Sequence, residues 1–111
     1  MAGKFDLKKS PSGKFMFNLK SGNGQIVLTS QLYDSKAAAE KGIASVRKNS
    51  SEEGRFERKV ATSGESYFVL KSGNSQVIGK SQMYKSKAAL ENGIASVKKN
   101  GAEAGLADST A

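Results

Sequence analysis

The sequence predicts an α+β fold, in which two tandem β-β-β-α(-β) repeats form one antiparallel sheet with two helices on one face. The second half of the chain repeats the first at a constant offset of 51 residues, so that Phe5 recurs as Phe56 and Tyr33 as Tyr84. Each copy contains three stretches of alternating apolar and polar residues, followed by one stretch with helical periodicity. Only a short loop separates the copies, and we therefore expect a single domain over residues 1–111.

The repeats, at about residues 4–54 and 55–109, predict internal two-fold pseudosymmetry. From Lys20 to Asn49, 20 of 30 residues are identical to those 51 positions later. One copy alone is short for a hydrophobic core, because small chains bury too little surface to offset the entropy lost on folding. We therefore expect the two copies to share one core.

The first repeat begins with three predicted strands. Residues 4–8 and 14–20 alternate apolar and polar side chains, as half-buried strands do, and residues 10–13 carry the Pro and Gly of a turn. Gly22-Asn23-Gly24 then predicts a hairpin turn, because Asn and Gly tolerate positive φ. Residues 25–30 form the third strand.

A helix follows, because the period changes from two to nearly four. Ala39, Ile43 and Val46 fall on one helical stripe, and Ser35 is a suitable N-cap. Asn49 is expected to close the helix in a left-handed conformation.

The helical glycine Gly42 costs helix stability, and its recurrence as Gly93 predicts a close approach of each helix to the sheet. The second repeat runs the same course, with strands at 55–61, 66–71 and 76–81 and a helix at about 87–99. The tail keeps the register, since residues 103–108 lie 51 positions after 52–57. We expect a strand there, with a frayed terminus as the alternative.

Three stretches of the chain carry a resemblance to a known family. They are Phe17 to Lys20 with Gly22-Asn23-Gly24, Leu28 to Tyr33, and Glu40 to Val46, each with its second copy. In these stretches the chain resembles the YegP-like family, the domain of unknown function numbered 1508. The resemblance implies β-β-β-α-β units in tandem, one sheet, and strands after the helices that are swapped between units. Gly105-Leu106-Ala107 is less strand-like than the family pattern, and the resemblance implies no activity.

Composition favours a basic protein outside the membrane. The net charge is +8, and the chain contains no Cys and no His. No apolar run approaches the ~20 residues of a membrane span, and the first residues lack the apolar stretch of a signal peptide. We expect a cytoplasmic monomer, a pseudo-dimer of two repeats, with no contact to membranes.

Catalysis is not expected. Without His, the usual general base near neutral pH and the commonest transition-metal ligand are both missing. The recurrent Ser30, Ser35 and Ser45 have no base beside them, and Glu40 and Glu91 each follow a Lys by four residues, as in surface ion pairs. We therefore predict a non-catalytic protein with no cofactor and no metal.

The start of each helix is the one candidate site. Ser35 with Lys36, and Ser86 with Lys87, could complete an anion-binding cradle with the free amides of a helix N-terminus. The alternative is simple N-capping beside a solvated Lys.

The function itself stays open between two classes. The positive charge and lysines along the strands favour a binding protein for single-stranded nucleic acid or another polyanion, with a basic surface that serves only solubility as the alternative for the charge. Tyr67, Tyr33 and Tyr84 are the aromatic residues that could face solvent on the sheet. The alternative is a protein–protein interaction module, whose sheet face or pseudo-axis receives a partner such as an acidic protein.

Overall fold

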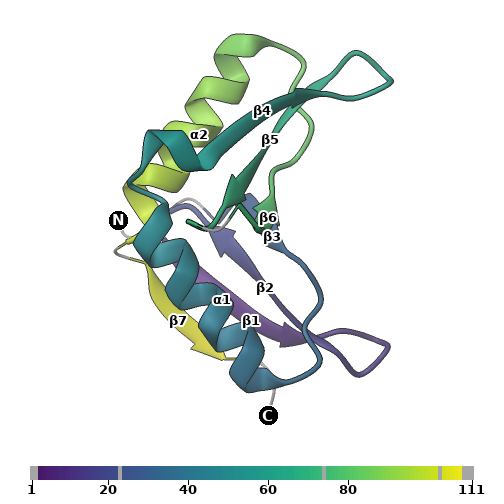
Figure 1. The fold of residues 1–111 in the computed structure, drawn as a ribbon, viewed down its shortest axis with the longest axis vertical. Helices are drawn as coiled ribbons and strands as arrows, with labels where there is room; N and C mark the ends of the chain where they lie inside the picture. Colours follow the sequence, from purple (N-terminus) through teal and green to yellow (C-terminus); the bar gives the residue numbers. More distant parts are fainter. Residues whose placement is uncertain (1–2, 23, 74, 103, 109–111) are drawn as a thin grey trace.

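The computed structural model describes residues 3–22, 24–73, 75–102 and 104–108. Its elements follow the predicted order, with three strands and a helix in each repeat and a strand in the tail (Figure 1). They are β1 (Lys4–Lys9), β2 (Phe15–Lys20), β3 (Ile26–Ser30), α1 (Lys36–Asn49), the 3-10 turn η1 (Glu53–Arg55), β4 (Phe56–Val60), β5 (Ser66–Lys71), β6 (Val77–Lys80), α2 (Lys87–Gly101) and β7 (Gly105–Asp108).

The seven strands form one sheet in the order β4-β5-β6-β3-β2-β1-β7. Each repeat contributes an antiparallel three-stranded meander, and the two meanders meet where β3 pairs with β6. That junction is short, because only Thr29 with Lys80 and Ser30 with Gly79 are paired.

The tail strand makes the sheet mixed, whereas the sequence predicted an antiparallel one. β7 lies parallel to β1, with Leu106 opposite Phe5. Parallel neighbours need a long connection in place of a hairpin, and here most of the chain lies between the two strands. Because β7 follows α2 of the second repeat and pairs with the first repeat, the swapped strand that the resemblance implied is present on this side of the sheet.

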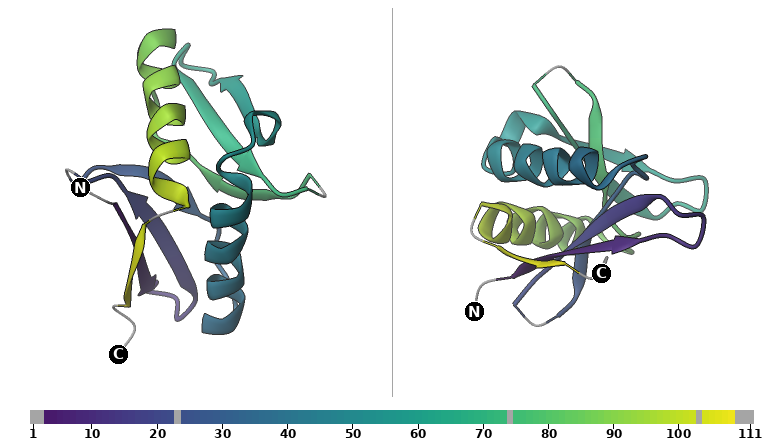
Figure 2. Two further views of the ribbon diagram at one scale, coloured as in Figure 1. Left: turned by 90° about the vertical axis from the view of Figure 1, so that its left-hand side faces the viewer. Right: turned by 90° about the horizontal axis from the view of Figure 1, so that it is seen from below.

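Both helices pack on the same face of the sheet and cover one hydrophobic core (Figure 2). The stripe of α1, with Ala39, Ile43 and Val46, meets the apolar side chains of the strands. Each helix also reaches into the other repeat, since α1 contacts β5 and β6 while α2 contacts β2 and β3. The two copies therefore share a single core.

The helical glycines lie at close contacts, as predicted. A Cβ at Gly42 would lie 2.8 Å from Tyr33 Cζ and 3.0 Å from Phe17 Cε2. A Cβ at Gly93 would lie 2.7 Å from Tyr84 Cζ. Each tyrosine ring stacks on a core phenylalanine, with centroids 6.2 Å apart for Tyr33 and Phe17. The glycines thus leave room for a half-buried tyrosine between helix and sheet.

Two details differ from the sequence predictions. Asn49 is the last residue of α1 and is followed by a right-handed C-cap at Ser50, so it does not close the helix in a left-handed conformation. Its buried amide instead donates to the Ser45 carbonyl (2.8 Å) and accepts from Arg55 Nε (3.1 Å). Tyr33 and Tyr84 are packed against the core, so that among the three tyrosines Tyr67 alone lies on the open sheet face.

We expect Gly42→Leu to destabilise the protein by about 1–3 kcal/mol, because a side chain there overlaps the Tyr33 ring and the helix must shift. This cost exceeds the helix-propensity gain of about 1 kcal/mol. Gly54→Leu is the matched control, because a Cβ at Gly54 would meet no atom within 4 Å. Thermal and denaturant unfolding measure both variants, and an unchanged midpoint for Gly42→Leu would contradict the assigned contact.

We expect residues 1–54 expressed alone not to fold as a stable monomer. This fragment loses β7 from β1, β6 from β3, and the cover that α2 gives to β2 and β3. Sedimentation and thermal melting decide the outcome, and a monomeric fragment with a cooperative transition would refute the shared core.

Candidate functional site

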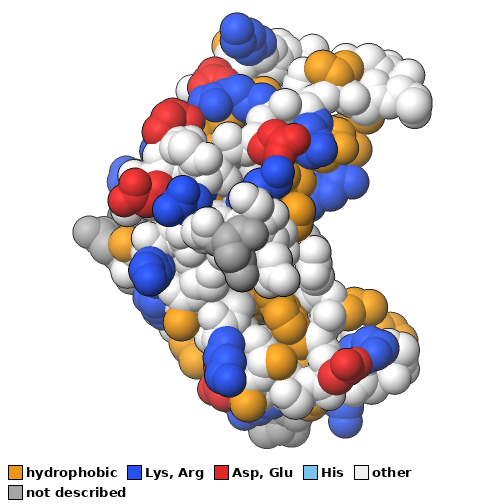
Figure 3. All heavy atoms as spheres, in the orientation of Figure 1, with side chains coloured by type: hydrophobic (Ala, Val, Ile, Leu, Met, Phe, Trp, Pro, Cys, Tyr) orange, Lys and Arg blue, Asp and Glu red, His pale blue; other side chains and the backbone are white. Residues whose placement is uncertain are grey.

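The sheet face opposite the helices is open and carries charged side chains from both repeats. Since Phe5 and Leu7 point into the core, the alternation of β1 places Lys4, Asp6 and Lys8 on the open face. Figure 3 shows the molecule hollowed on the side away from the helices, between the β1–β2 and β4–β5 hairpins that project there in Figure 1. The β3–β6 junction lies between the two hairpins.

A group of two lysines and one carboxylate recurs on this face in each repeat. Asp6 Oδ2 lies 3.7 Å from Lys8 Nζ and 3.3 Å from Lys20 Nζ. In the second repeat, Glu57 forms ion pairs with Lys59, at 3.1 Å, and with Lys71. All three positions differ by 51 between the repeats. Each group leaves one net positive charge, and we call these the two lysine groups.

The carboxylates of these groups hold the lysines in place along the strands. Hydrogen bonds from Lys71 and then Lys59 keep the pKa of Glu57 below its ordinary value, so it stays ionised at neutral pH. Among the described residues, Lys4 and Lys80 also lie on the open face, which thus carries six lysines against two carboxylates, Asp6 and Glu57. The difference of four is half of the net charge of +8.

The centre of the open face differs between the repeats. Lys80 Nζ lies 4.7 Å from the centroid of the Tyr67 ring, a cation–π contact. The related positions in the first repeat are Met16 and Thr29, and Thr29 donates a hydrogen bond to Asn18 Oδ1 (2.8 Å). In the part of the chain that the structure describes, the face therefore presents one aromatic ring, which belongs to the second repeat. Beside it, a pocket of about 410 Å³ follows the β3–β6 junction.

The predicted anion sites lie at the starts of the helices, at opposite ends of the molecule (Figure 1). Ser35 Oγ and Ser86 Oγ each accept from the amide three residues later, at 3.1 Å, which is ordinary N-capping. Lys36 Nζ lies 2.5 Å from Asp108 Oδ2 of β7, and this contact raises the pKa of Lys36. Lys87 is exposed and forms no ion pair within the described part of the chain. The first site thus already faces a carboxylate of the protein itself.

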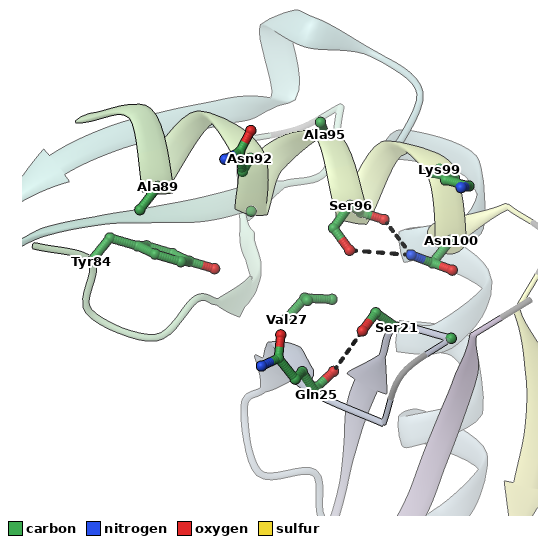
Figure 4. A pocket seen from close by; sticks show the side chains of 12 residues that line it. Ser21, Gln25, Val27, Tyr84, Ala89, Asn92, Ala95, Ser96, Lys99 and Asn100 are labelled. Carbon is green, nitrogen blue, oxygen red and sulfur yellow. Dashed lines mark hydrogen bonds between the residues drawn. The ribbon is translucent and has the colours of Figure 1, made fainter. Parts of the chain in front are cut away.

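A groove between α2 and the β2–β3 turn was not foreseen (Figure 4). It has a volume of about 820 Å³, and Ser21, Gln25, Tyr84, Ser96 and Lys99 contribute to its walls. The related groove beside α1 is smaller, about 460 Å³. No sequence motif predicts these grooves. The signal that the sequence does contain is that Ser21, Gln25 and Ser96 are identical in both copies.

In the wall of the larger groove, the side chain of Asn100 is hydrogen-bonded to Ser96 and to the backbone of Gly3. Asn100 Nδ2 donates to the Ser96 carbonyl (2.8 Å) and to Ser96 Oγ (3.2 Å), while Asn100 Oδ1 accepts from the Gly3 amide (3.0 Å). In the smaller groove, Arg55 Nε takes the place of that amide at Asn49. These grooves carry fewer charged side chains than the open face, so we take the open face as the candidate site.

The recurrent serines that could have been nucleophiles have structural partners. Ser30 Oγ accepts from the Phe17 amide at 2.9 Å and donates to the Gln31 carbonyl at 2.8 Å, and Ser81 repeats both bonds. These hydroxyls tie the strand ends at the β3–β6 junction to the next strand. Within the described residues, no group of three or more Asp, Glu, Cys or His side chains is placed to hold a metal ion.

Comparison with known proteins gives concordant matches. The family described as Domain of unknown function (DUF1508) matches residues 10–57 and again residues 61–108. The UPF0339 protein YegP of Escherichia coli K12 is 56% identical over 110 residues, which cover 99% of this chain and 100% of the relative. A UPF0339 protein of Pseudomonas aeruginosa is 55% identical over 108 residues, covering 97% and 98%.

Solved structures agree with the fold. The solution NMR structure of the Escherichia coli protein yegP, described as of unknown function, superimposes with a TM-score of 0.94 at 55% identity, covering 99% of this chain and 95% of that one. A UPF0339 protein of Shewanella oneidensis gives 0.93 at 48% identity, covering 99% and 93%. No helix in the described residues is long and apolar enough to cross a membrane.

We expect two of the three tyrosines to ionise late in the native protein. Burial raises the pKa of Tyr33 and Tyr84 above the ordinary 10.0, because desolvation disfavours the phenolate. Since the folded-state pKa values exceed the unfolded ones, this contribution to stability is present below pH 10 and is lost as the pH rises through the folded-state values. Phenolate absorbance measures the titration. Tyr33→Phe and Tyr84→Phe should each remove one late step, and a step unchanged in both variants would contradict the assignment.

Proposed function

This chain belongs to the DUF1508 family, and from that premise we propose that it is a small, monomeric, non-catalytic binding protein of the cytoplasm whose ligand is single-stranded nucleic acid. The ligand lies across the open face of the sheet. One observation carries the proposal: six lysines and two carboxylates share that face, which has one lysine group in each repeat. Half of the net positive charge of the chain thus lies on a surface that the helices do not cover.

Electrostatics supports a phosphate backbone as the ligand. Each phosphate that a lysine neutralises releases a condensed counterion, and this release drives binding without regard to sequence. In each lysine group the carboxylate cancels one charge and leaves one, so a strand crossing both repeats meets positive charge at either end. Lys4 and Lys80 add to this path.

The arrangement favours a single strand over a duplex. Both helices lie on the opposite face, so neither can enter a major groove. Sheet strands twist, and a flexible single strand can follow a twisted surface that a stiff duplex cannot. Tyr67, with Lys80 over its ring at 4.7 Å, offers a place where a base can stack.

A protein partner on this same face would need an apolar surface. Among the described residues, the exposed large apolar side chains are Leu32, Val60, Met83 and Leu106. Leu32 and Met83 lie in loops. Val60 follows Lys59 at the end of β4 and Leu106 lies in β7, but strand alternation places both on the side of the sheet that faces the helices. The open face is therefore better suited to a polyanion.

We expect the protein to bind a labelled oligothymidylate or oligouridylate of about 12 nucleotides, measured by fluorescence anisotropy. If four phosphates are neutralised, the logarithm of the affinity should fall with that of the salt concentration with a slope of about −3. Lys20→Ala with Lys71→Ala should weaken binding about five- to tenfold. No binding at low salt would remove nucleic acid from consideration.

Two matched double variants locate the surface, because each removes the same charge. Lys48→Ala with Lys99→Ala lies at the helix C-termini and should change the affinity by less than about twofold. Lys36→Ala with Lys87→Ala tests the predicted anion sites at the helix N-termini. If this last pair alone weakened binding, the ligand would lie at the helix starts and not on the open face.

A further inference from the structure

The two outer edges of the sheet are treated differently by the chain. β7 lies on the outer edge of β1, where Gly105 opposes Lys4 and Asp108 opposes Leu7. On the other side the sheet ends at β4, and no strand among the described residues pairs with its outer edge. The unpaired backbone groups of such an edge are a template for another strand.

The chain cannot fill the β4 edge in the way it fills the β1 edge. The residues that the repeat relates to β7 are 54–57, since β7 runs from 105 to 108. Those residues already form the end of η1 and the start of β4. In this chain the residues related to β7 are therefore part of η1 and β4 themselves, and they cannot also pair with the outer edge of β4.

The contacts of β7 show what a strand at such an edge needs. Leu106 opposes the core residue Phe5, which is fully buried. Two residues later, Asp108 faces the helix side of the sheet and its carboxylate lies 2.5 Å from Lys36 Nζ at the start of α1. The strand thus combines backbone pairing with one apolar residue and one carboxylate.

The β4 edge offers the related partners. Phe56 takes the place of Phe5, and Lys87 at the start of α2 takes the place of Lys36. α2 lies over β4 as this requires, because Arg58 donates to both Glu91 oxygens at 2.6 and 2.8 Å, one turn beyond Lys87. Glu91 is therefore bonded to Arg58 and not to Lys87, although the charge of Lys87 also helps to lower the pKa of Glu91. Lys87 is exposed and forms no ion pair among the described residues.

We propose that the outer edge of β4 binds an extended acidic peptide segment of another protein as an eighth strand, parallel to β4. An apolar side chain of the peptide lies opposite Phe56, and a carboxylate two residues later reaches Lys87. Backbone hydrogen bonds supply the affinity and the two side chains supply the choice of partner.

A second copy of this chain is the poorer occupant. Its own β7 could add to β4 only by leaving β1, so that one strand pairing would be exchanged for another without gain. Two β4 edges facing each other would place the charged residues Glu57, Arg58 and Lys59 of both copies along the seam, and charges on edge strands discourage such pairing. An unpaired acidic segment meets neither obstacle.

The test uses a synthetic peptide that copies residues 102–108, with the amide shifts of the full-length, isotope-labelled protein followed by NMR. We expect shifts along β4 and at the start of α2. Lys87→Ala should weaken binding about two- to fivefold, the range of an exposed ion pair. Lys99→Ala, at the far end of α2, is the matched control and should leave the affinity unchanged.

The peptide supplies further controls. Replacing the residue that corresponds to Asp108 by Asn should cost as much as Lys87→Ala, and the two changes should not add, since they remove the same contact. Replacing the residue that corresponds to Ala107 by Pro should abolish binding. Shifts confined to β1 and β7, no shifts at about 1 mM peptide, or concentration-dependent dimerisation through β4 without peptide would each overturn the proposal.

Discussion

The shared core across the β3–β6 junction is the constraint on which the rest of the structure depends. Only two residue pairs join the strands there, which is too little to hold two halves of a sheet together. The helices supply the remainder, because each packs on its own repeat and on the other. Gly42 and Gly93 permit this packing by admitting a tyrosine ring under each helix. Because both helices pack on one face of the sheet, the opposite face is not covered by them and can carry charged side chains.

Sequence periodicity was enough to predict the elements and their order. Alternation located the strands, the Ala39-Ile43-Val46 stripe located α1, and the register of the repeat located the tail strand. The direction of the tail strand could not be predicted from periodicity, because its parallel pairing with β1 depends on where α2 ends. The conformation of Asn49 could not be predicted for a similar reason. Its side-chain amide accepts a hydrogen bond from Arg55, which lies beyond the end of α1.

The candidate site was only partly visible in the sequence. Lysines along the strands indicated a basic protein, but the sequence did not predict on which face of the sheet their charge would gather. The lysine groups depend on strand register as well, since Lys20 joins Asp6 only because β1 and β2 pair as they do. At the helix N-termini the reverse is true: the local sequence pattern is present, but it does not predict the surroundings. Ser35 and Lys36 form the expected pattern, but their surroundings are decided by Asp108, which is 72 positions away from Lys36 in the chain. Contacts of this range follow from topology and not from local pattern.

Joining the repeats in one chain allows differences that two identical subunits could not have. Ser50 and Gly101 are equivalent in the repeat and touch each other where the helix ends meet, since a Cβ at Gly101 would lie 2.5 Å from Ser50 Cβ. Two serines could not occupy this contact, and even one leaves its buried hydroxyl without a hydrogen-bond partner among the described residues. The asymmetry is therefore required by packing at this point.

The same freedom extends from the core to the surface. One outer edge carries β7 and the other is open, and one repeat presents Tyr67 with Lys80 where the other presents Met16 with Thr29. The lysine groups, by contrast, occur in both repeats, each with two lysines around one carboxylate. On the proposed function, duplicated lysine groups suit a repeating polyanion, because successive phosphates are alike. In the same proposals, the features that would select one base or one peptide are Tyr67 with Lys80 and the open edge of β4, and these occur in one repeat only.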